Sequence, residues 1–152
     1  MKLEKNKLIA KNQAAYHNYD IIDKIEAGIV LFGTEIKSIR QGKVNLKDSY
    51  AVIEKNKEVF VYSMNISNYE NGNIYNKDPL RPKKLLLNKN EINKLIGLTS
   101  QKGYSLIPIS LYFKGNFVKM ELGIGRGKKL FDKREDLKKK EADIKIARYL
   151  KN

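Results

Sequence analysis

Apolar and polar residues alternate in three stretches of the chain, and this period of two predicts β-strands. The first stretch is residues 19–31, where Gly28 is the expected position of a β-bulge. Residues 49–66 predict two strands joined by a turn at Asn56. Residues 104–125 predict a hairpin, because two alternating runs flank Gly115-Asn116, a pair typical of tight two-residue turns.

Two segments follow a helical period instead. Residues 33–41 place Ile36 and Ile39 on one side of a short helix, with Thr34 as its expected cap and Gly42 as its expected end. Residues 88–101 predict an amphipathic helix that stops before Gly103. Many short strands with few helices predict a mainly β fold, an antiparallel β-barrel of the oligonucleotide-binding type with a few flanking short helices.

The composition changes after Gly127. Residues 128–152 hold ten lysines and arginines, and their sparse apolar residues recur mainly every seven positions, which makes a thin stripe. We therefore expect residues 1–127 to form the β-barrel domain and residues 128–152 to form a basic C-terminal tail. Such a tail is expected to be mobile when free and helical when a partner covers it.

Charge points to the class of partner. The chain of 152 residues has 31 lysines and arginines against 17 acidic residues, a net charge of +14. Like charges on a compact body repel one another, so folding does not favour this balance, whereas a bound polyanion offsets the repulsion. The balance favours a nucleic-acid partner, and an anionic membrane surface is the main alternative.

The residue types present exclude several chemistries. The chain has no cysteine and one histidine, so thiolate nucleophiles, disulfides and cysteine or histidine metal sites are excluded. The segment GIGRGKK is not a phosphate-binding P-loop, since Leu122 and Lys129 occupy positions that require glycine and a hydroxyl residue. The N-terminus lacks the apolar run of a signal peptide, and no run has the length of a membrane span, which predicts a cytoplasmic protein.

The cations form candidate phosphate contacts. Lys37 and Arg40 share a helix face, with Glu35 beside them as a default ion-pair partner. Further candidates lie beside the long loop of residues 67–82 and at the glycine-rich end of the last strand, where a solvated loop and a flexible hinge remain open alternatives. The strand aromatics, Phe117 included, are expected in the core, whereas Tyr16, Tyr69, Tyr75 and Phe131 are freer to stack on bases.

Four segments together resemble the small protein B family, the SsrA-binding or tmRNA-binding proteins of bacteria. They are NQAAYHNYDI, EAGIVLFGTEIKSIRQGKVNLKDSYA, NKDPLRPKKLLLNKNEI and LYFKGNFVKMELGIGRGKKLFDKRE. The resemblance implies a non-catalytic adaptor, without cofactor, metal or small-molecule substrate. It implies binding to the tRNA-like domain of tmRNA and delivery of that RNA to stalled ribosomes for trans-translation, which tags the stalled peptide and rescues the ribosome. It also implies elongation factor Tu-GTP as a partner, through alanylated tmRNA.

The resemblance also assigns residues. The face for the tRNA-like domain would comprise Asn12, Glu35, Lys37, Ser38, Arg40, Lys43 and Asn45. Further RNA contacts would come from Lys83, Lys84, Arg126, Gly127, Lys128 and Lys129. In the tail, Phe131, Asp132, Lys133 and Arg134 would reach the decoding centre, with the tail helical in the mRNA channel of the ribosome.

Three rival functions remain open on the sequence. A general single-stranded or ribosomal RNA-binding protein would show no preference for a tRNA-like fold. A metal-dependent nuclease built on carboxylates would cut RNA in magnesium or manganese, although no motif supports it. A membrane-surface protein would bind anionic vesicles at physiological salt.

Overall fold

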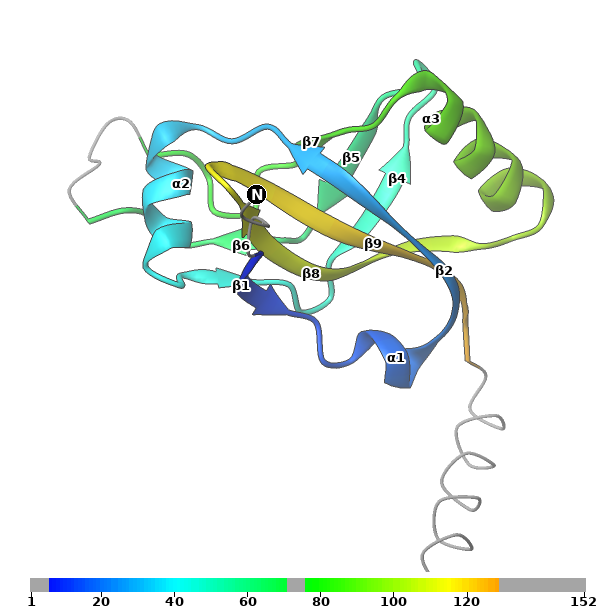
Figure 1. The fold of residues 1–152 in the computed structure, drawn as a ribbon, viewed down its shortest axis with the longest axis horizontal. Helices are drawn as coiled ribbons and strands as arrows, with labels where there is room; N and C mark the ends of the chain where they lie inside the picture. The colour runs from blue at the N-terminus through cyan, green and yellow to red at the C-terminus, as the bar shows by residue number, and fades with distance from the viewer. Residues whose placement is uncertain (1–5, 71–75, 129–152) are drawn as a thin grey trace, which may run out of the picture.

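The computed structural model describes residues 6–70 and 76–128. The strands are β1 (Lys7–Lys11), β2 (Tyr19–Ile29), β3 (Val44–Asn45), β4 (Tyr50–Ile53), β5 (Val59–Tyr62), β6 (Asn65–Ile66), β7 (Lys83–Leu86), β8 (Ser105–Lys114) and β9 (Phe117–Gly127). The helices are α1 (Ala15–Asn18), α2 (Gly33–Arg40) and α3 (Lys89–Ile96), and α3 continues into the π-helical turn η2 (Gly97–Gln101). Figure 1 shows α2 at one end of the molecule and α3 at the other.

The main sheet closes on itself. Its strand order is β1-β8-β4-β5-β7-β2-β9, and β8 also pairs with β9 from Ser105 opposite Gly125 to Lys114 opposite Phe117. On its other edge β8 meets β4 at Leu106 and β1 further along. All of these pairings are antiparallel. Because β9 returns to pair with β8, the strands from β8 to β9 close into a barrel, and β1 adds to it as an edge strand on β8. The structure confirms the mainly β prediction, and the assignment to the oligonucleotide-binding type stays a prediction.

The inward positions of these strands make one main core. Burial alternates along β5 and the first half of β9, as a strand with one face inside requires, and residues 122–125 of β9 are all buried. The fully buried side chains include Val59, Leu111, Met120 and Leu122. The two longer helices join the same core through Ile39 of α2 and Leu95 of α3. Burying these side chains is the main force that holds both helices to the barrel.

Close backbone approach explains the glycines of β9. A Cβ atom on Gly125 would lie 2.4 Å from the backbone oxygen of Asp20, and one on Gly123 would lie 2.7 Å from Ile109 Cδ1. Glycine is therefore required at position 125, where the backbone of the paired strand β2 leaves no room, whereas at position 123 the nearest atoms belong to the side chains of Ile109 and Ile21. The register shift in β2 falls between Ile21 and Asp23, so the prediction of a bulge at Gly28 is wrong.

The hairpin over Gly115-Asn116 and the turn between β4 and β5 are confirmed. The cap of α2 is Phe32 and not Thr34, because Glu35 Oε1 accepts a hydrogen bond from the Phe32 amide at 2.9 Å. Phe117 is 71% exposed at the hairpin, so its expected place in the core is wrong. None of the helices in residues 6–70 and 76–128 is long and apolar enough to cross a membrane.

Candidate nucleic-acid interface

Helix α2 presents cations to solvent on the side opposite its core contact. Ser38 and Ile39 are buried under the helix, whereas Lys37 and Arg40 are exposed. Gly42 adopts a φ of 73°, a left-handed conformation that ends the helix and leads the chain to Lys43. The periodicity of the sequence therefore sorts these residues correctly, with the cations outside and the apolar residues inside.

The loop before β7 adds cations beside α2. Lys77 Nζ lies 4.5 Å and Arg81 Cζ 4.8 Å from the centroid of the Phe32 ring, so two cations contact one aromatic side chain. Lys37 Nζ lies 5.4 Å from the Tyr69 ring on the other flank of the helix. Together, Lys37, Arg40, Lys43, Lys77 and Arg81 form what we call the α2 basic face.

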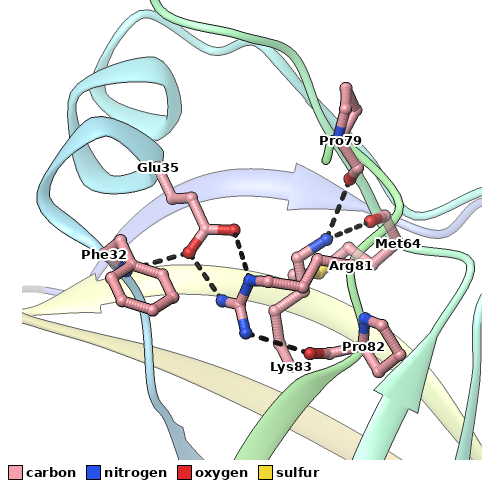
Figure 2. Close-up of polar contacts among 7 residues, drawn as sticks. All are labelled: Phe32, Glu35, Met64, Pro79, Arg81, Pro82 and Lys83. Carbon is pink, nitrogen blue, oxygen red and sulfur yellow. Dashed lines mark hydrogen bonds and ion pairs between the residues drawn. The ribbon is translucent and has the colours of Figure 1, made fainter. Parts of the chain in front are cut away.

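A buried ion pair fixes the geometry of this face (Figure 2). Glu35, 5% exposed, accepts hydrogen bonds from Arg81 Nη2 at 2.7 Å and Arg81 Nε at 3.3 Å. Arg81 Nη1 also donates to the carbonyl oxygen of Pro82 at 3.0 Å. The carboxylate of Glu35 thus joins the start of α2 to the loop. Because it is buried and already accepts these bonds, it acts as a positioning group and not as an acceptor for base edges.

Lys83 anchors the same loop from inside the protein. Its side chain is fully buried, and Nζ donates to the carbonyl oxygens of Met64 at 2.6 Å and Pro79 at 2.9 Å (Figure 2). Burial lowers the pKa of Lys83 to about 8; the charge of Glu35 opposes this shift and that of Arg81 adds to it. The ammonium group is thus not available to a phosphate.

The depressed pKa predicts how stability depends on pH. Between about pH 8 and 10.5 the unfolded chain keeps a proton on Lys83 that the folded protein has released, so the contribution of Lys83 to stability rises with pH. Lys83→Met is expected to be less stable than the wild type at every pH, because it leaves two buried carbonyl groups without their donor. Its deficit should grow by about 3 kcal/mol across this interval. Urea unfolding of both proteins at several pH values measures the deficit, and a constant deficit would contradict the depressed pKa.

Three further predicted residues, Asn12, Ser38 and Asn45, differ in whether their side chains reach the surface. The amide group of Asn12 is buried and donates to the carbonyl oxygen of Pro108 at 2.9 Å, which ties the N-terminal segment to β8. Ser38 Oγ is buried without a hydrogen-bond partner within residues 6–70 and 76–128. Asn45 is exposed, and its side chain accepts a hydrogen bond from the Lys47 amide at 2.8 Å. Of these three, only Asn45 lies where its side chain can meet RNA.

The remaining described candidates lie on β7 and at the end of β9. Lys84 Nζ is 3.7 Å from Glu58 Oε1 on the outside of the sheet. Arg126 is exposed near the end of β9, with Cζ 4.5 Å from the Tyr104 ring and Nη2 donating to the Lys102 carbonyl at 2.9 Å. Gly127 and Lys128 follow it, and the Lys128 amide donates to the Asn18 carbonyl at 2.8 Å. Lys129 and the tail residues Phe131, Asp132, Lys133 and Arg134 lie outside the described residues.

Two contributors to the site were missed by reading the sequence. Lys77 and Phe32 come from separate loops, and nothing in their local patterns indicates that they meet. Arg81 is one of the cations beside the loop of residues 67–82, but its partner Glu35 is 46 residues away in the chain. A periodic pattern reports which face is buried and carries no information on which distant residues pair.

Comparisons with known proteins agree on one family. The family model described as SmpB protein matches residues 9–152. Relatives named SsrA-binding protein include that of Thermoanaerobacter pseudethanolicus, 59% identical over 99% of this chain and 96% of the relative. The one from Acetivibrio thermocellus is 60% identical over 99% of this chain and 97% of the relative. A solved structure described as "tmRNA-SmpB: a journey to the center of the bacterial ribosome" matches with a TM-score of 0.67 and 42% identity, over 84% of this chain and 93% of that chain.

Proposed function

The chain belongs to the SmpB protein family, and from this premise we propose how its surfaces perform the family's task. The protein is a non-catalytic RNA-binding adaptor that binds tmRNA and acts with the ribosome in trans-translation. We propose in addition that it recognises the tRNA-like domain of tmRNA and delivers the RNA to stalled ribosomes.

The α2 basic face is the observation that carries this proposal. Lys37 and Arg40 are exposed on α2, Lys77 and Arg81 flank the Phe32 ring at its start, and Lys43 follows its end, where Nζ lies 3.6 Å from Glu70 Oε1. The Glu35–Arg81 pair holds the helix and the loop together. Cations carried on a folded surface lose less conformational freedom when they bind phosphates than lysines on a flexible chain would. We propose that Lys37, Arg40, Lys43 and Asn45 contact the tRNA-like domain directly. Glu35, Ser38 and Lys83 are buried in α2 and beside the loop that pairs with it, whereas the buried Asn12 ties the N-terminal segment to β8.

The end of β9 supports a second part of the proposal. Arg126 is exposed there, and the chain continues from Lys128 into the basic segment of residues 129–152. We propose that Phe131, Asp132, Lys133 and Arg134 of this segment act at the decoding centre, after tmRNA has bound. The proposal includes a cytoplasmic location and elongation factor Tu-GTP as a partner that reaches the protein through alanylated tmRNA.

A competition experiment tests the RNA specificity. Labelled tRNA-like domain of tmRNA is bound to the full chain at physiological salt and challenged with the unlabelled domain, with elongator tRNA and with an unstructured RNA of equal length. We expect only the unlabelled domain to displace the label at near-stoichiometric concentration. Elongator tRNA and unstructured RNA should require at least about tenfold more, because only part of the contact surface would be satisfied.

Equal competition by all three RNAs would contradict the adaptor specificity. The protein would then be a general RNA-binding barrel, in which charge alone sets affinity. The same reactions, supplied with magnesium and resolved on a denaturing gel, show whether the RNA is recovered intact, as expected for a non-catalytic protein.

A further inference from the structure

A trough lined by tyrosines lies where β4 and β8 separate. The two strands pair only at Ala51 opposite Leu106, and beyond this point they leave a hollow of about 330 Å³. Its walls include Tyr19, Tyr50 and Tyr104, together with Thr99 of η2. A second hollow, of about 240 Å³, shares Tyr19 and Tyr50 with the first. We call the two together the tyrosine trough.

The tyrosine rings in the trough are held in place from outside it. Tyr50 is 47% exposed and stacks on Tyr62, with ring centroids 5.6 Å apart and an interplanar angle of 15°. The Tyr62 hydroxyl donates in turn to Glu54. Tyr104 is covered by the guanidinium group of Arg126, whose centre lies 4.5 Å from the ring centroid. Rings fixed in this way lose little conformational freedom when a flat ligand stacks on them.

The trough combines features that suit an unpaired base. Tyr50 offers an exposed aromatic ring, and any of the four bases can stack on such a ring, because every base has a π-face. The hollow of about 330 Å³ has room for several waters or one planar ring system. The exposed Arg126 at its edge supplies a cation for the adjoining phosphate. The net charge of +14 favours an anionic strand over a neutral peptide as the occupant.

We propose that the tyrosine trough binds an unpaired nucleobase of an RNA strand, stacked on Tyr50 or Tyr104, with the neighbouring phosphate on Arg126. The inference rests on the proposed RNA-binding function but assigns a site separate from the α2 basic face. Figure 1 shows α2 at one end of the barrel, and the start of β2 and the end of β9 at the other. The two sites therefore engage different parts of an RNA, and each can be altered without the other.

A fluorescence experiment tests the site directly, because the chain has no tryptophan. Tyr50→Trp and Tyr104→Trp each place a single reporter in the trough, and Phe117→Trp places one on the exposed hairpin beside Lys119 as a control. Each full-length variant is titrated with a single-stranded oligouridylate, an oligoadenylate and an RNA duplex of equal length. We expect saturable quenching of both trough reporters by the single strands, little by the duplex and none at Phe117→Trp. Tyr50→Leu should weaken single-strand binding about tenfold, since it removes one stacking partner.

The outcomes separate this site from the function on which it rests. Oligonucleotide binding without quenching in the trough overturns the site, and the specificity for the tRNA-like domain can still hold. Equal quenching by duplex, or at Phe117→Trp, also overturns it, because the signal then reports general proximity to RNA. Quenching confined to the trough supports the site even if the tRNA-like domain fails to outcompete other RNAs, a result that would overturn only the proposed specificity.

Discussion

Replacing Arg81 by alanine is expected to lower the free energy of unfolding by about 3 kcal/mol. The substitution removes the cation that lies 2.7 Å from Glu35 and leaves a carboxylate that is 5% exposed without its partner. Breaking a buried ion pair from one side costs more than the pair contributes, because the remaining charge stays desolvated. The Arg81 side chain is itself 25% exposed, which places the expected loss at the lower end of the range for fully buried pairs. Urea unfolding at neutral pH measures it.

Lys77→Ala is the matched control for this experiment. Lys77 contacts the same Phe32 ring, but its ammonium lies on an exposed side chain and is no part of the Glu35–Arg81 pair. Its loss should cost about 1 kcal/mol or less. The double variant Glu35→Gln/Arg81→Ala should be more stable than Arg81→Ala alone, since the unpaired charge is gone. If Arg81→Ala and Lys77→Ala unfold alike, the buried pair does not hold the face together.

The predictable part of the fold is the part that local patterns encode. Alternation along residues 104–125 reports which side chains face the core, so the β8–β9 hairpin and its turn could be predicted from the sequence. Helix α2 could be predicted because the helical spacing of its apolar residues is also a local pattern, although the residue at its N-terminal cap could not. Thr34 has the favoured side chain for that role, but Glu35 bonds back to the Phe32 amide and begins the helix earlier.

The unpredictable part of the site depends on partners far apart in the chain. Lysine is a residue type that often binds phosphate. Only the fold shows that the ammonium group of Lys83 is bound to the carbonyls of Met64 and Pro79. Gly125 resembles part of a phosphate loop, and only its close approach to the backbone of Asp20 in the paired strand β2 explains it. In both cases the residue type states what the side chain can bind, whereas the tertiary structure decides what it does bind.

Both proposed RNA sites depend on side chains that the barrel holds rigid. The α2 basic face has its helix and loop joined by Glu35, and the tyrosine trough has its rings held by Tyr62 and Arg126. Binding then orders few protein groups, so more of the electrostatic and stacking energy appears as affinity. The positive charge of the chain explains attraction to any RNA, and the fixed geometry is what can distinguish one RNA fold from another.

Reversing the charge of Lys37 and Arg40 is expected to reduce affinity for the tRNA-like domain about 100-fold at physiological salt. Both side chains are exposed on α2 and away from the core, so the double variant Lys37→Glu/Arg40→Glu should fold normally. Two phosphate contacts are lost and two repulsive charges are introduced. The slope of log affinity against log salt should therefore fall by about two or more. Filter binding or fluorescence anisotropy over a range of salt concentrations gives both quantities.

The matched control changes the net charge by the same amount at another place. Lys55→Glu/Lys57→Glu alters two exposed lysines in the turn between β4 and β5, far from α2 in Figure 1. Each double variant lowers the net charge of +14 by four units, so long-range attraction weakens equally in both. If direct contact at α2 determines affinity, only the α2 variant loses most of its affinity, and only in this variant does the slope of log affinity against log salt fall markedly. Equal losses in both variants would show that total charge alone draws RNA to this protein, and the α2 basic face would then have no specific role in recognition.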